Sequence, residues 1–148
     1  MKLHTYFFTG ILLFTGFLSF TQDNTIYGSG AGTQGKRNSF FGYNSGKTTT
    51  GVRNVFIGYE TAIKNTKGAY NVMIGDRAGY ANKTGYRNTF LGTLSGYKNE
   101  TGSFNTATGA YSGFQNTTGS NNISFGYEAG LKNTPGSYNT FIGISAGA

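Results

Sequence analysis

Cysteine is absent from this chain of 148 residues. The sequence therefore contains no disulfide framework, no lipoprotein attachment site and no thiolate metal site. A small protein without disulfides has to obtain its stability in another way, and stacked repeats and oligomerisation are the two routes open to this one.

Histidine and proline are nearly absent as well, with one residue of each. The only histidine, His4, lies in the N-terminal apolar segment, so the remainder lacks the commonest general base and the commonest soft nucleophile. The Asp-containing nonapeptides of calcium-binding β-rolls do not occur either. We therefore expect no catalytic residues, no cofactor and no metal site.

Residues 1–21 have the pattern of a secretory signal peptide, with a basic start at Lys2 and an apolar run over residues 6–20. Ser19 and Thr21 place small residues at the −3 and −1 positions of a cleavage site before Gln22. A permanent membrane anchor is the alternative, although the run is shorter than the roughly 20 apolar residues of a spanning helix. We expect a secreted mature chain of residues 22–148.

Acidic residues are few, with 5 Asp and Glu against 12 Lys and Arg and a formal net charge of +7. Removal of Lys2 with the signal peptide lowers this charge by one, and the remaining positive charges are spread along the chain. Such a balance favours weak contact with polyanions such as lipopolysaccharide, acidic glycans or nucleic acid. A solvated, solubilising surface is the other interpretation.

The dominant positive feature is a repeated pentapeptide, in which Asn is followed by three mostly apolar or hydroxyl residues and then Gly. It occurs at residues 24–28, 38–42, 54–58, 71–75, 88–92, 105–109, 122–126 and 139–143. The last six copies recur every 17 residues, whereas the first two intervals are 14 and 16 residues. A fixed short period indicates one unit stacked on copies of itself, which presents a long surface instead of a single catalytic pocket.

One repeat, residues 71–87, indicates how a coil is built. Its first segment is rich in β-formers and ends at Gly75. Small residues at 78–79 predict a corner that leads to a second extended piece, and residues 82–85 predict a turn. The unit is too short for a helix plus a strand with both connections. We predict an all-β fold, a parallel β-solenoid of seven to eight coils with two short strands per coil, each coil adding roughly 4.8 Å of height.

Residues one repeat apart lie above one another in such a solenoid, and asparagine fills two of these rows. The first row contains Asn54, Asn71, Asn88, Asn105, Asn122 and Asn139, and the second contains Asn65, Asn82, Asn99, Asn116 and Asn133. Stacked amides can bond to one another and to turn backbone. We predict that the first row is a buried structural ladder at the entry of each strand.

The strand segment carries apolar residues on both faces, because side chains alternate along a strand. One set comprises Ile57, Ile74, Leu91, Phe125 and Ile142, and the other comprises Phe56, Met73, Phe90 and Phe141. One face lines the coil's own core, so apolar residues on the other face indicate that it is covered, most simply by another copy of the chain. We predict that Phe56, Met73, Phe90 and Phe141 face outward and form this interface. A kink that turns both sets inward is the alternative.

The carboxylates offer little chemistry. Glu60 and Glu128 occupy the same repeat position four coils apart, about 19 Å at the usual strand spacing, which is too far for a paired acid and base. A dyad of Glu60 with Asp76, one coil away, is conceivable.

Two further rows concern binding. Lys64, Lys98 and Lys132 form a sparse basic row that could follow an acidic polymer, or they are simply solvated turn residues. Thr84, Thr101 and Thr118 form a short hydroxyl row. Because a regular row of Thr on a flat face can order water, ice binding is an alternative class of function.

The Asn-Thr-Phe-Ile-Gly segment at 139–143, followed by the small pair Ser145-Ala146, resembles the head repeats of trimeric autotransporter adhesins, the YadA-like heads. It is also similar to Gly/Asn-rich repeats ahead of chaperone domains in tail-fibre proteins. The resemblance covers residues 24–148 and implies a left-handed β-roll that forms a homotrimer at a Gram-negative cell surface. It further implies binding to host matrix, glycan or another surface ligand, without catalysis. The chain departs from this family in its longer period, and its 148 residues contain no recognisable stalk, membrane barrel or chaperone segment, so we expect that anchoring by the family's own route does not apply.

We therefore expect a non-enzymatic secreted or cell-surface protein, either an adhesin head or a structural fibre element. No specific nucleic-acid partner is expected, and a membrane would be reached only through a separate anchor. The alternatives are an ice- or glycan-binding solenoid and a fragment of a larger trimeric fibre protein.

Overall fold

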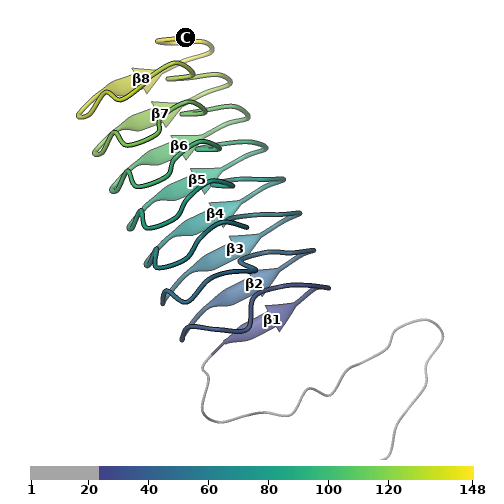
Figure 1. Cartoon of the computed structure of the whole chain (residues 1–148). Helices are drawn as coiled ribbons and strands as arrows, with labels where there is room; N and C mark the ends of the chain where they lie inside the picture. Colours follow the sequence, from purple (N-terminus) through teal and green to yellow (C-terminus); the bar gives the residue numbers. More distant parts are fainter. Residues whose placement is uncertain (1–23) are drawn as a thin grey trace, which may run out of the picture.

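The computed structural model describes residues 24–148, and the expected signal peptide lies outside this part. Eight three-residue strands follow one another: β1 (Thr25–Tyr27), β2 (Ser39–Phe41), β3 (Val55–Ile57), β4 (Val72–Ile74), β5 (Thr89–Leu91), β6 (Thr106–Thr108), β7 (Ile123–Phe125) and β8 (Thr140–Ile142). They form one parallel sheet in chain order, and the coils stack from β1 at one end to β8 at the other (Figure 1). The predicted all-β parallel solenoid is confirmed. Residues 24–148 contain no helix with the length and apolar character needed to span a bilayer.

The strand register follows the repeat without slippage. Phe56 pairs with Met73, and Met73 pairs with Phe90. The two shorter intervals do not shift the register, because Phe40 still pairs with Ile26 on one side and with Phe56 on the other. The difference in repeat length is therefore accommodated in the turns between strands.

Each coil contains one strand instead of the predicted two. The residues after Gly79 that were expected to be extended are turns. Arg77 and Gly79 have φ values of 51° and 59°, and an extended strand cannot pass through residues in this left-handed region. This side of the coil still bonds to its neighbour, since the N–H groups of Gly79 and Ala81 donate to carbonyls of the next coil at 2.9 Å. The stack is thus hydrogen-bonded on both sides, with regular strands on one.

The middle residue of each strand points into the coil and builds the core. Its buried members are Phe40, Phe56, Met73, Phe90, Ala107 and Ser124. The rings of Phe40 and Phe56 stack with centroids 5.1 Å apart, and small residues such as Ala62 and Ala78 complete the buried cluster. The core is therefore a single column of side chains that runs along the solenoid and narrows at Ala107 and Ser124.

The prediction that Phe56, Met73, Phe90 and Phe141 face outward was wrong. Phe56 and Met73 are 0% exposed, Phe90 is 1% exposed, and Phe141 in the last coil is half-buried. These side chains fill the core of the chain itself, so they cannot form an interface between copies.

The alternation of side chains along the strand explains this reversal. Asn54 precedes Phe56 by two residues, and residues two apart on a strand share a face. Asn54 is fully buried, so Phe56 has to point inward as well. The neighbouring residue Ile57 then points outward and is 37% exposed, which also excludes a kink that turns both sets inward.

Candidate binding surface

The first asparagine row forms a continuous ladder at the strand entry. The Oδ1 atom of every member before Asn139 accepts the backbone N–H of the asparagine one coil further on, as in the bonds from Asn88 to Asn71 and from Asn105 to Asn88, both at 2.9 Å. The pattern continues through Asn122 and Asn139, at 2.9 and 3.0 Å. It also begins earlier than the six predicted members, because Asn54 N–H donates to Asn38 and Asn38 N–H donates to Asn24.

The second asparagine row shares its acceptors with the first. The amide groups of Asn71 and Asn82 both donate to the carbonyl of Gly85, at 2.9 and 3.1 Å, and Asn88 and Asn99 do the same at Gly102. A Cβ atom at Gly85 would lie 2.4 Å from Asn82 Oδ1, so only glycine permits this approach. Both rows are scaffold, since their amides are used inside the coil and most members are buried.

Asn88→Ala is expected to lower the free energy of unfolding by about 1–3 kcal/mol, because it removes the acceptor of a buried Asn105 N–H. Asn139 is only half-buried, and its amide makes one bond, to Asn133 at 3.1 Å. Asn139→Ala is therefore expected to cost about 0.5 kcal/mol. Urea unfolding of the two variants measures the difference. Equal, wild-type stability of both would contradict a structural ladder.

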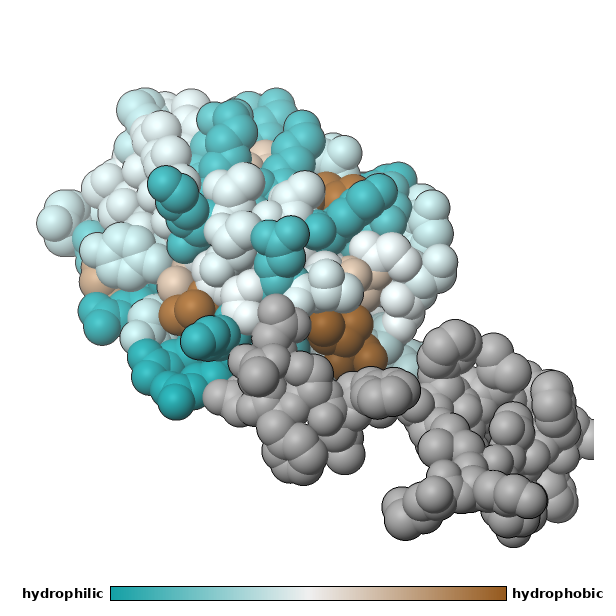
Figure 2. Space-filling model, turned by 60° about the horizontal axis from the view of Figure 1, so that its bottom comes forward, coloured by the Kyte–Doolittle hydropathy of each residue, from teal (hydrophilic) through white to brown (hydrophobic). Residues whose placement is uncertain are grey.

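The outward residues of the sheet form an apolar strip, here called the outer strand row, made by the third residue of each strand. Its largest exposed members are Tyr27, Phe41, Ile57, Ile74, Phe125 and Ile142. Tyr43 and Tyr59 stand beside it, stacked at 5.4 Å. At the β1 end of the stack, Figure 2 shows separate apolar patches among polar and neutral surface. The predicted row of Ile57, Ile74, Leu91, Phe125 and Ile142 is thus the one that reaches solvent.

A second surface row combines arginine with aromatic residues, and the sequence reasoning missed it. This edge row comprises the last residue of each repeat, immediately before the ladder asparagine: Arg37, Arg53, Tyr70, Arg87, Phe104, Asn121 and Tyr138. The Arg53 guanidinium lies 5.1 Å from the Tyr70 ring centroid and donates from Nη1 to the Tyr70 hydroxyl. Arg87 lies 5.7 Å from Tyr70 and 5.4 Å from Phe104. The signal in the sequence was the concentration of Arg and aromatic residues at one repeat position.

The predicted lysine row sits against a different aromatic column. Tyr80, Tyr97 and Phe114 stack at 5.0 and 5.1 Å, and Lys64 and Lys98 lie 5.0 and 5.7 Å from the rings of Tyr80 and Phe114. Lys132 is exposed in the same row. The predicted hydroxyl row of Thr84, Thr101 and Thr118 is exposed too, but Lys67 and Pro135 occupy the same position at either end of it.

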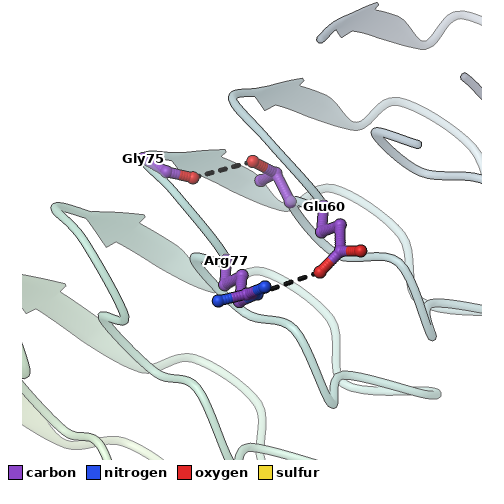
Figure 3. A network of polar contacts seen from close by, with 4 residues as sticks. Glu60, Gly75 and Arg77 are labelled. Carbon is purple, nitrogen blue, oxygen red and sulfur yellow. Dashed lines mark hydrogen bonds and ion pairs between the residues drawn. The ribbon is translucent and has the colours of Figure 1, made fainter. Parts of the chain in front are cut away.

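Glu60 and Glu100 are engaged with basic residues. Glu60 accepts a hydrogen bond from Arg77 Nε at 2.9 Å on the next coil, beside the bond from Thr61 to the Gly75 carbonyl (Figure 3). This contact gives Glu60 a cation as its partner instead of the conceivable Asp76. Lys83 pairs with Glu100 at 2.7 Å. The Glu60 charge also raises the pKa of neighbouring Tyr59. Among residues 24–148, no group of three metal-binding side chains comes together.

No model of a known protein family, no curated protein and no solved structure matches this chain. The surface rows therefore have to be interpreted from their own chemistry.

Proposed function

We propose that this chain is a non-enzymatic repeat protein that is secreted or displayed at the cell surface, where it acts as an adhesin head or a structural fibre element. The observation that carries the proposal is that a single sheet repeats the same outward positions from β1 to β8. A repeated, elongated surface suits contact with an extended partner. The resemblance of the Asn-Thr-Phe-Ile-Gly segments to YadA-like heads supports the same class of function.

We further propose that the chain forms a homotrimer through the outer strand row. Exposed apolar side chains that recur along a sheet indicate an interaction surface, and in this row they recur at most of the strands, with Thr108 as the hydroxyl exception in β6. Phe125 and Ile142 are 57% and 70% exposed in the single chain, so burial against another copy would remove much apolar area from water. The trimeric state itself is taken from the resemblance to autotransporter heads.

The purified mature chain is expected to sediment as a trimer at micromolar concentration. Replacing Ile57 and Ile74 by serine should yield a folded monomer, because both side chains are 37% exposed in the single chain and association would bury that remaining area. The pair Ile63→Ser and Leu131→Ser, outside the strand face, is the control and should leave the trimer intact. Sedimentation velocity with circular dichroism separates dissociation from unfolding. A wild-type monomer would refute association through this row.

Adhesion is tested by coating beads with the mature protein and measuring their attachment to matrix-covered and bare surfaces. Attachment that requires the folded protein supports the adhesin role. If the beads attach to no surface, the adhesin role is refuted and the structural fibre role is the one proposed. A thermal-hysteresis measurement on the same preparation tests the ice-binding alternative.

A further inference from the structure

We propose that the N-terminal half of the edge row binds an acidic polysaccharide, through the guanidinium groups of Arg53 and Arg87. This inference deepens the proposed adhesive function by naming a ligand class, and it rests on that function. It does not depend on the trimer.

The two guanidinium groups are held in place by aromatic contacts. Tyr70 lies one coil from each arginine, and its ring is contacted by both guanidiniums, at 5.1 and 5.7 Å. Arg87 also contacts Tyr86 and Phe104, at 6.0 and 5.4 Å. Contact with several rings restricts the side chain before any ligand arrives, and this lowers the entropy lost on binding.

These arginines have unused capacity for anions. A guanidinium has five N–H donors, and Arg53 uses one of them on the Tyr70 hydroxyl. Neither arginine forms an ion pair with a carboxylate among residues 24–148, where the ion pairs join Glu60 to Arg77 and Lys83 to Glu100. Both arginines are exposed. An external carboxylate can therefore form the two parallel bonds that the arginine fork favours.

The spacing of the two charges favours a polymer of regular repeat. Arg53 and Arg87 are two coils apart, about 9.6 Å at the usual strand separation. This distance is close to the length of a disaccharide in an extended chain. A polysaccharide in which a uronate alternates with a neutral sugar would therefore present one carboxylate to each arginine.

The same contacts disfavour single-stranded nucleic acid. Such binding requires aromatic ring faces on which bases can stack. The Tyr70 ring is contacted by two guanidiniums and the Phe104 ring by Arg87, so a stacking base would compete with these cations for rings that are 44% and 41% exposed. The edge row thus offers charge at intervals, and its rings serve to hold that charge.

The test measures binding of a fluorescent hyaluronan octasaccharide to the mature protein at low salt. The double variant Arg53→Gln and Arg87→Gln is expected to bind at least about tenfold more weakly, because it loses two charge-assisted contacts. The control is Lys64→Gln with Lys98→Gln, which removes the same charge from two lysines that also lie over rings. This control should bind within about twofold of wild type, since its lysines lie outside the edge row. The same octasaccharide with esterified carboxylates should not bind.

Three results would overturn the inference: no binding by the wild type, equal weakening by the arginine and lysine pairs, or tighter arginine-dependent binding of an oligothymidylate. If the Gln pair does not fold, Arg53→Lys with Arg87→Lys decides, because it keeps the charge and loses the planar fork. Unchanged affinity of that pair would also overturn the inference. Absent octasaccharide binding with bead adhesion intact refutes only this inference, whereas absent adhesion with binding intact refutes only the adhesin role within the proposed function.

Discussion

Phe90→Ala is expected to lower the free energy of unfolding by about 3–5 kcal/mol, the usual cost of emptying a fully packed aromatic site. Phe90 is 1% exposed and occupies the single core column between Met73 and Ala107. Each coil contributes one side chain to this column, so few neighbouring side chains can repack into the cavity that the substitution creates. The loss should appear as a lower urea midpoint in circular dichroism at every protein concentration.

Phe125→Ala is the matched control for Phe90→Ala, because the same atoms are removed from a side chain that is 57% exposed. Its effect on the isolated coil should be small. In a trimer held by the outer strand row, the effect should grow at concentrations where the wild type is assembled, since association stabilises the folded state by mass action. A greater, concentration-independent loss for Phe125→Ala than for Phe90→Ala would contradict the assignment of inner and outer rows.

Gly96→Ala is expected to be the second most damaging change, at about 2–5 kcal/mol in total. Gly96 has a φ of 59°, where an L side chain costs about 1–2 kcal/mol. A Cβ atom there would lie 2.5 Å from ring carbons of Phe90, and such overpacking adds about 1–3 kcal/mol. Thermal and urea unfolding of the purified variant measure the sum.

Gly113→Ala separates the two contributions to the Gly96 result. Gly113 has nearly the same φ, 58°, but its added Cβ would meet only the Ala107 Cβ at 3.3 Å and the Ser124 hydroxyl at 3.9 Å. This variant should therefore carry the backbone cost alone. The double variant Gly96→Ala with Phe90→Ala should cost less than the sum of its parts, because the clash is gone. Identical stability of Gly96→Ala and Gly113→Ala would refute the steric explanation.

Much of the scaffold could be predicted because the repeat places like residues in contact. Asn71 and Asn88 stand 17 residues apart, and in a parallel stack this puts one amide beside the next backbone N–H. A buried amide needs such partners, so the ladder could be inferred from spacing alone. Gly85 lies in the turn predicted at residues 82–85, and the structure shows that close packing between amides and carbonyls constrains this position.

The inward and outward faces were predicted the wrong way round, although one observation would have decided them. Both faces of the strand are apolar, so hydrophobicity could not distinguish Phe56 from Ile57. The buried Asn54 lies on the Phe56 side by the two-residue alternation of a strand, and that relation places Phe56 in the core. The prediction of a second strand was wrong for a different reason. Glu60 and Ala62, like Arg77 and Gly79, have positive φ values that cannot be predicted from residue type alone.

The amino-acid sequence by itself determined the period, the parallel in-register stacking and the asparagine ladder, because each follows from identical residues recurring at one interval. Only the tertiary structure decided which surface residues of neighbouring coils meet, such as Arg53 with Tyr70. The path of each coil depends on the backbone angles at its corners. It also depends on glycines such as Gly96, which leave room for the core side chain Phe90. These contacts join residues that are far apart in the sequence until the coil is complete, so a short segment does not predict them.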